Sequence, residues 1–136
     1  MIRVTENIVN RSQLLDTHCG SRLHLGCGTN VVDAWINLDG SLGVLISNVP
    51  SLHQILRRPI GNPPFFRSKL SPKIKFHDVR SPLPFANESI SAIYCSPMLE
   101  HLYRNEQERR IKECYRVLRP WGVVRILVPD LAYMIN

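Results

Sequence analysis

The feature that most constrains the fold is a series of short apolar segments, several of which end on a glycine or an acidic residue. They occupy residues 22–25, 35–39, 74–77, 90–95 and 123–128. Short apolar runs bounded by turn-forming residues predict β-strands. Helical patterns or long crossovers separate them, and strands joined in this way form a parallel sheet with helices packed on its faces. The chain is therefore expected to adopt an α/β fold.

Two of the connecting stretches show the apolar spacing of helices. Residues 42–56 have this spacing, although Pro50 is expected to break or kink the helix. A second helix is expected from Asn105, which can cap it together with Glu108 three residues later. The apolar face predicted for this second helix consists of Ile111, Cys114, Tyr115 and Leu118.

Prolines mark the irregular parts of the chain. Residues 57–73 contain four prolines and are expected to form a loop or insertion. Residues 119–122 form a turn, with Pro120 second and Gly122 fourth. Because tryptophan tolerates a positive φ poorly, Trp121 in the third position favours a type I turn over a type II turn.

The chain is long enough for one compact domain with a hydrophobic core, since it has 136 residues. We divide it into an N-terminal extension, residues 1–20, and a domain over residues 21–136 that includes the insertion at 57–73. The proportions of 44% hydrophobic and 21% charged residues exclude wholesale disorder and a collagen-like chain. No apolar run approaches the roughly 20 residues that span a bilayer, and the first ten residues do not resemble a signal peptide.

The four cysteines show neither CxxC pairing nor the spacing of a zinc site. They are expected to be free thiols in a reducing compartment, which favours the cytoplasm, and no metal site is expected.

One segment accounts for the whole net charge of +6. Residues 41–77 contain no acidic residue and six lysines or arginines. A nucleic-acid or anionic-membrane surface is one interpretation, and a solvated basic loop is the other. The segment lacks the interleaved aromatic residues of single-strand binders, since only Phe65 and Phe66 lie nearby, so the solvated loop is favoured.

Candidate binding residues fall at the ends of the predicted strands, where open parallel sheets bind their ligands. Gly26 and Gly28 lack a Cβ atom, so ligand atoms can approach their backbone, although a plain tight turn would also explain them. Asp39 follows Gly28 by eleven residues, and a carboxylate there can accept both hydroxyls of a ribose. The alternative for Asp39 is a helix N-cap. A dinucleotide-binding fingerprint is disfavoured, because Val31 stands where its third glycine would be.

Six blocks of sequence, taken in order, resemble the class I S-adenosylmethionine-dependent methyltransferases. The resemblance is closest to a small bacterial type (type 11-like) associated with polysaccharide biosynthesis, and it runs from about residue 22 to residue 136 except for the insertion. The blocks are Leu23-His24-Leu25-Gly26-Cys27-Gly28, Trp35-Ile36-Asn37-Leu38-Asp39, His77-Asp78-Val79-Arg80-Ser81-Pro82-Leu83-Pro84-Phe85, Leu99-Glu100-His101-Leu102, Glu113-Cys114-Tyr115-Arg116-Val117-Leu118-Arg119-Pro120 and Val128-Pro129-Asp130-Leu131.

The resemblance implies a Rossmann-like sheet of order 3-2-1-4-5 and a site for S-adenosyl-L-methionine. In this family the turn after the first strand receives the methionine part of the cofactor, the acid after the second strand holds the ribose, the acid after the third lies at the adenine, and the end of the fourth lies near the sulfonium. The corresponding residues here are Leu25, Gly26, Cys27, Gly28, Asp39, Asp78, Val79 and Ser96.

Catalytic candidates follow from the same resemblance. His101 is the histidine best placed to act as a general base for a hydroxyl acceptor, with Glu100 as the second choice. A structural, hydrogen-bonded role for His101 is the alternative. Ser96 followed by Pro97 is explained without chemistry as a helix cap with proline in the first helical position.

The chain departs from the family pattern in length, since related domains continue through another helix and two more strands. Residues 123–128 would then form an exposed apolar edge. Either a second copy of the chain or another partner covers this edge, or the chain is a truncated gene product.

The expected function is transfer of a methyl group from S-adenosyl-L-methionine to a small-molecule acceptor, such as a sugar hydroxyl or another metabolite. One alternative is a non-catalytic remnant that binds a nucleoside or a partner. A nicotinamide-dependent oxidoreductase is less favoured. Membrane and nucleic-acid partners are not expected.

Overall fold

The structure is a computed structural model that describes residues 20–47, 71–130 and 133. The expected extension (1–20) and insertion (57–73) lie outside these residues except at their last positions, as do residues 48–56 of the first predicted helix and Cys19. The elements are β1 (Ser21–Leu25), β2 (Ile36–Asp39), α2 (Leu42–Ser47), β3 (Ile74–Phe76), β4 (Ile90–Cys95), the 3-10 turn η1 (Leu99–His101), α5 (Arg104–Val117) and β5 (Leu118–Ile126).

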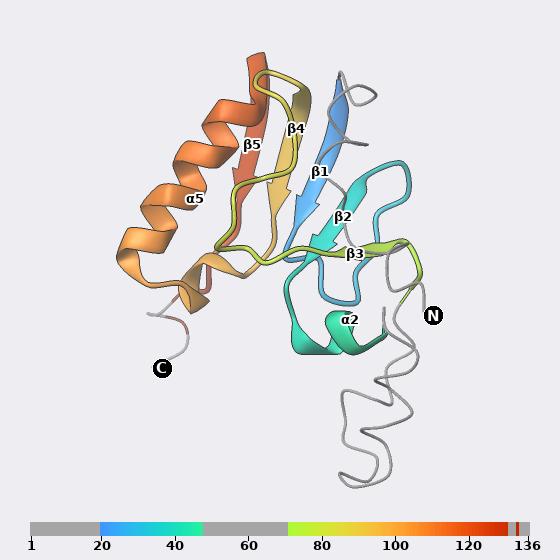
Figure 1. Ribbon diagram of the computed structural model, residues 1–136. Helices are drawn as coiled ribbons and strands as arrows, with labels where there is room; N and C mark the ends of the chain where they lie inside the picture. The colour runs from blue at the N-terminus through green and yellow to red at the C-terminus, as the bar shows by residue number, and fades with distance from the viewer. Residues whose placement is uncertain (1–19, 48–70, 131–132, 134–136) are drawn as a thin grey trace, which may run out of the picture.

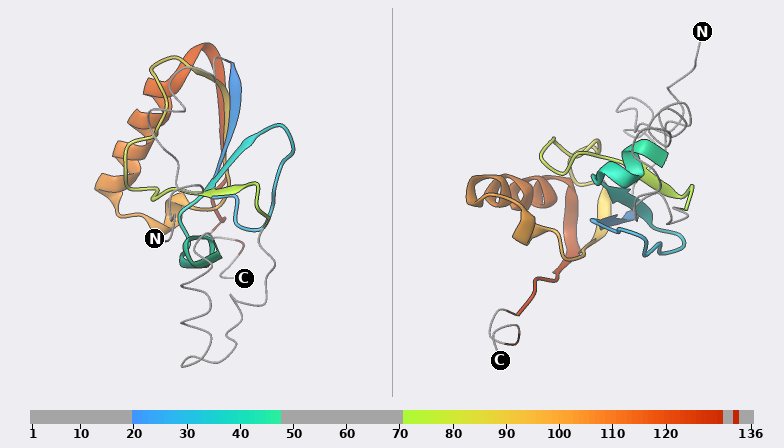
Figure 2. Two further views of the ribbon diagram at one scale, coloured as in Figure 1. Left: turned by 45° about the vertical axis from the view of Figure 1, so that its right-hand side comes forward. Right: turned by 90° about the horizontal axis from the view of Figure 1, so that it is seen from below.

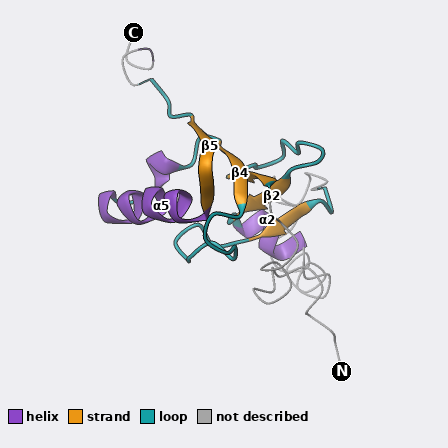
Figure 3. Ribbon diagram, turned by 90° about the horizontal axis from the view of Figure 1, so that it is seen from above, coloured by secondary structure: helices purple, strands orange, loops and turns teal. Residues whose placement is uncertain are grey.

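The five strands form one parallel sheet in the order β3-β2-β1-β4-β5. This confirms the predicted Rossmann-like α/β fold and its strand order. All strands point toward the same edge of the sheet, and α2 and η1 lie at that edge (Figure 1). Further views show α5 alongside the β4–β5 end of the sheet and α2 near the β2–β3 end (Figures 2 and 3).

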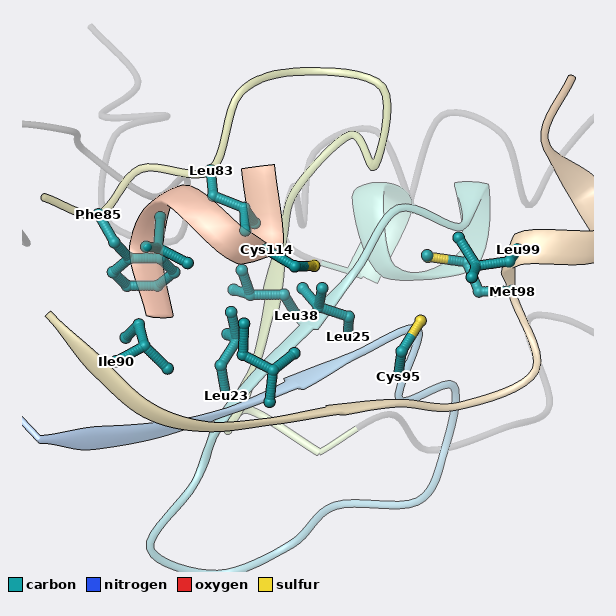
Figure 4. Close-up of a cluster of buried hydrophobic side chains, with 12 residues drawn as sticks. Leu23, Leu25, Leu38, Leu83, Phe85, Ile90, Cys95, Met98, Leu99 and Cys114 are labelled. Carbon is teal, nitrogen blue, oxygen red and sulfur yellow. The ribbon is translucent and has the colours of Figure 1, made fainter. Parts of the chain in front are cut away.

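The main core lies between one face of the sheet, the segment before β4 and α5. The parallel register aligns Leu23 with Ile93 and Leu25 with Cys95, so that alternate residues of β1 and β4 point to the same face. Leu83 and Phe85, in the segment before β4, pack into this core, as does Cys114 of α5 (Figure 4). This packing holds the sheet, the segment before β4 and α5 together, and so positions the strand ends at which the predicted site lies.

Helix α5 begins and packs differently from the prediction. Its N-cap is Tyr103, whose amide donates to Glu106 Oε2 at 3.0 Å, so the predicted pair Asn105 and Glu108 is wrong by two residues. The buried side chains are Arg110, Cys114 and Val117, whereas Ile111 and Tyr115 of the predicted face are 51% and 83% exposed. The predicted apolar face was wrong because Arg110 is buried, whereas sequence patterns assign charged residues to the solvent.

The predicted type I turn at residues 119–122 is wrong. Trp121 has a φ of 64°, which matches the third position of a type II turn, and its side chain is 100% exposed. Residues 119–122 lie within β5, which begins five residues before the predicted strand at 123–128. They form a bulge, because Ile90 pairs with Leu118 but Ala92 pairs with Val123, so β5 takes up extra residues opposite β4.

We expect Trp121→Gly to raise the free energy of unfolding by about 0.5–1 kcal/mol, because glycine adopts a positive φ without steric cost and the exposed indole contributes little burial. Urea denaturation measures this difference. Trp121→Ala is the matched control, since it removes the same indole but keeps a Cβ at positive φ. An equal response of the two variants would contradict the prediction.

β5 lies at one end of the sheet, next to β4 only. Val123, Val124, Ile126 and Val128 are between 39% and 64% exposed. These exposed apolar residues belong to the segment predicted as an apolar edge; a partner that covers it stays a prediction. None of the described helices is both long and apolar enough to cross a membrane.

Candidate functional site

The turn after β1 depends on two glycines in the left-handed region. Gly26 has a φ of 65° and Gly28 a φ of 53°, conformations that residues with a Cβ rarely adopt. The amides of Gly26 and Cys27 both donate to Leu38 O, at 2.9 and 3.3 Å, which fixes the turn against the end of β2. A Cβ on Gly26 would lie 2.8 Å from Met98 Cβ, whereas a Cβ on Gly28 would meet nothing within 4 Å. The backbone at Gly28 is thus open to a ligand.

Asp39 ties this turn to the start of α2. Its side chain is 7% exposed, and Oδ2 accepts a hydrogen bond from the Gly28 amide at 2.8 Å. Oδ1 accepts from the amide of Ser41 at 2.8 Å, which lies one residue before α2, so Asp39 is not the N-cap of this helix. A carboxylate oxygen can accept more than one hydrogen bond, so each retains capacity for a ligand hydroxyl.

Asp78 lies at the neighbouring strand end, beside Asp39. The His77 amide donates to Asp39 O at 3.0 Å, and a Cβ on Gly40 would lie 2.8 Å from His77 O. Asp78 accepts hydrogen bonds from the Arg80 amide and guanidinium at 3.0 to 3.2 Å. These bonds and the charge of Arg80 lower the pKa of Asp78, so its carboxylate stays ionised well into the acidic range. The structure therefore brings both aspartates to one edge.

Ser96 completes this edge on the side of β4. Its amide donates to Leu25 O at 3.0 Å, which places it next to the glycine turn. The predicted helix cap at Ser96 and Pro97 is wrong, because the following turn, η1, has Met98 as its N-cap. Met98 itself is buried, and its side chain packs beside Gly26.

Glu100 and His101 lie in η1, at the same edge of the sheet (Figure 1). Both are exposed, with His101 Nε2 3.9 Å from Glu100 Oε1. Gln107 of α5 holds this turn, because its Nε2 donates to Leu99 O at 2.9 Å and to Leu102 O at 3.1 Å. Sequence reasoning missed Gln107, and no local signal distinguishes it from other polar residues of the helix.

The two remaining predicted residues of the turn are buried. Leu25 and Cys27 are each 1% exposed, so their side chains pack and only their backbone can face a ligand. Burial and the nearby Asp39 raise the pKa of Cys27 to about 12, so its thiol is not a nucleophile near neutral pH. Cys27, Cys95 and Cys114 are free, in agreement with the predicted thiols.

Two buried histidines flank the strand ends. His24 is 1% and His77 9% exposed, and burial lowers the pKa of both below the ordinary value of 6.5. The charge of Arg110 lowers the pKa of His77 further. Both rings are therefore neutral in the folded protein near neutral pH.

We expect these histidines to make the protein less stable as the pH falls below about 6.5. The unfolded chain then binds protons that the folded chain excludes. The free energy of unfolding therefore falls as the pH is lowered, until the pH reaches the pKa values of the folded protein. Urea denaturation at about pH 7.5 and 5.5 measures this loss, and His77→Gln should reduce it. An undiminished loss of stability in His77→Gln would contradict the assignment of the effect to His77.

Arg110 is a second residue that sequence reasoning missed. It is 3% exposed, and its Nη2 donates to Val79 O and to Ser81 O, the latter at 2.7 Å. The available signal was its position four residues before Cys114, on the face that turns toward the core.

Comparison with known proteins gives one family and a set of structures. A family model described as a methyltransferase domain matches residues 23–126. No curated protein matches the chain. Among solved structures, a candidate S-adenosyl-L-methionine-dependent methyltransferase from Methanococcus maripaludis is similar, with 13% identity and a TM-score of 0.44. The match covers 78% of this chain and 47% of that protein, so the chain spans about half of its length.

Proposed function

The chain belongs to the methyltransferase domain family, and on that premise we propose that it binds S-adenosyl-L-methionine at the carboxyl edge of its sheet and transfers the methyl group to an acceptor. The observation that carries the proposal is the convergence of three features on that edge: the glycine turn after β1, Asp39 and Asp78. The resemblance of the six sequence blocks supports the same cofactor.

The local chemistry fits the parts of this cofactor. The open space beside Gly28 leaves room for the methionine part to approach the turn closely. Asp39 has accepting capacity for the ribose hydroxyls. Asp78, ionised through its contact with Arg80, can accept the exocyclic amine of adenine, with Val79 beside it. Ser96 would lie near the sulfonium, since it adjoins the glycine turn.

When bound, the cofactor supplies an already activated methyl group, so the chain's own task is to orient the acceptor and exclude water. A hydroxyl acceptor also loses a proton, and we assign the general base to His101, with Glu100 as the second candidate. Gln107 fixes the turn that carries both side chains through its bonds to Leu99 and Leu102.

We propose a small-molecule acceptor, such as a sugar hydroxyl of the kind found in polysaccharides, or another metabolite. This assignment rests on family association alone. A partner or a second copy that pairs with the apolar edge of β5 is a separate proposal, supported by the exposure of Val123, Val124 and Ile126.

Isothermal titration with S-adenosylhomocysteine tests the proposal, and we expect saturable binding by the folded protein. NADH should neither bind nor compete, which separates the proposal from the oxidoreductase alternative. Absence of S-adenosylhomocysteine binding by well-folded protein would overturn the assignment. Binding without methyl transfer to any of a panel of sugar acceptors would favour the non-catalytic alternative.

A further inference from the structure

Arg110 is a buried cation on a helix face that otherwise packs against the core. Among the described residues of α5, it shares this inner face with Cys114 and Val117. Its guanidinium makes no ion pair within the part of the chain that the structure describes. A buried charge without a carboxylate partner costs free energy, which only strong hydrogen bonds offset.

The hydrogen bonds of Arg110 all go to one segment. Its Nη2 donates to Val79 O and to Ser81 O, two carbonyls in the segment that follows Asp78. These bonds join parts of the chain 31 and 29 residues apart, so they connect the loop after β3 to α5. Arg110 thereby fixes the backbone directly beside Asp78.

The other contacts of Asp78 with residues 80 and 81 of this loop are local. The Arg80 amide and guanidinium bind Asp78, and the Ser81 amide donates to Asp78 O at 2.9 Å. These bonds shape the loop around Asp78. Its far end is tied to α5 separately, since the Leu83 amide donates to Glu113 Oε2 at 2.8 Å and Arg116 Nη2 donates to Leu83 O at 2.9 Å. A hollow of about 300 Å³ also lies between residues 79–82 and α5, and Arg110 is one of the residues that line it. Arg110 bridges the loop and the helix beside this hollow.

We propose that Arg110 is a positioning residue for the adenine end of the cofactor, acting through the carbonyls of Val79 and Ser81 to hold Asp78 in place. The inference rests on the proposed function, since it assumes that Asp78 faces the adenine amine. Arg110 itself does not touch the ligand, because it is buried behind the loop. Loss of its hydrogen bonds frees residues 79–81 of the loop, and the orientation of Asp78 toward the amine is lost with them.

The test compares two ligands that differ at the group Asp78 would recognise. S-adenosylhomocysteine carries the exocyclic amine, and S-inosylhomocysteine carries a carbonyl oxygen in its place. We expect the wild-type protein to prefer the amine-bearing ligand by about tenfold or more, since a carboxylate accepts from an amine and repels a carbonyl. We expect Arg110→Leu to reduce this preference to about threefold or less, mainly by weaker binding of S-adenosylhomocysteine.

Arg109→Leu is the matched control, because Arg109 is exposed on the same helix and its Nε donates only to Asn105 O. It should keep the wild-type preference. Arg110→Lys should give an intermediate preference, since lysine keeps the charge but lacks the planar fork. This variant also decides the question if Arg110→Leu does not fold.

The outcomes separate the two proposals. If the wild-type protein binds neither ligand, the proposed function fails. If it prefers the amine and the Arg110 variants keep that preference, or lose affinity for both ligands equally, then Arg110 has only a structural role and the inference is overturned. A selective loss of the preference in the Arg110 variants supports the inference.

Discussion

Asp39→Ala should weaken the binding of S-adenosylhomocysteine by at least about tenfold, which corresponds to the loss of a hydrogen bond to a charged group, roughly 1.5–3 kcal/mol. Two effects combine at this position. The variant loses the carboxylate proposed to hold the ribose hydroxyls, and it leaves the Gly28 and Ser41 amides without their acceptor. The glycine turn and the start of α2 then lose their common anchor.

Isothermal titration measures the affinity, with thermal unfolding as a check that the variant is folded. Asp33→Ala is the matched control, since Asp33 forms an exposed ion pair with Lys73 at 2.7 Å, and exposed pairs contribute little. Asp39→Asn should lie between the wild type and Asp39→Ala, because an amide oxygen can accept from only one of the two backbone groups at a time. Wild-type affinity in Asp39→Ala would show that the ligand binds elsewhere.

Gly26→Ala should lower the free energy of unfolding by about 2–4 kcal/mol, the largest stability effect we expect in the turn. Part of this loss comes from placing a Cβ at a φ of 65°, and part from its approach to 2.8 Å of Met98 Cβ. Backbone strain alone accounts for about 1–2 kcal/mol. The rest of the loss in unfolding free energy reports how closely Met98, at the start of η1, packs against the glycine turn.

Gly28→Ala isolates the backbone contribution, because its φ is also positive while its Cβ would meet no atom within 4 Å. We expect it to cost only about 1–2 kcal/mol by urea denaturation. In a double-mutant cycle, Gly26→Ala should cost less in a Met98→Gly background than in the wild type, since Met98→Gly removes the atom that is approached. Equal losses for Gly26→Ala and Gly28→Ala would contradict the close packing of Met98 on the turn.

The strands could be predicted from the sequence because each carries its own local signal. The apolar run at residues 90–95 and the glycines after Leu25 mark a strand and its end without reference to the rest of the chain. The predicted start of α5 was wrong by two residues, because the cap is formed by the Tyr103 amide and the Glu106 carboxylate. In the sequence, the pair Asn105 and Glu108 has the same spacing and is an equally good candidate. Local patterns locate an element more reliably than they locate its ends.

The buried face of α5 could not be predicted, because the burial of Arg110 depends on carbonyls 29 and 31 residues away. The positive φ of Trp121 has a similar origin, since it lies in the bulge of β5 where the register between β4 and β5 shifts, and local propensity opposes this φ. In both places a contact between distant segments overrides the preference of the residue itself.

By itself, the sequence determined the succession of strands, the glycine and aspartate residues at their ends, and the resemblance to one family. Only the tertiary structure decided which of these residues meet: Asp39 with the Gly28 amide, His77 with the end of β2, and Arg110 with the loop beside Asp78. The physical reason is the distance along the chain over which each feature is determined. A strand end is set by neighbouring residues, whereas a hydrogen bond between two strand ends depends on register and packing, which arise only once the whole sheet has formed.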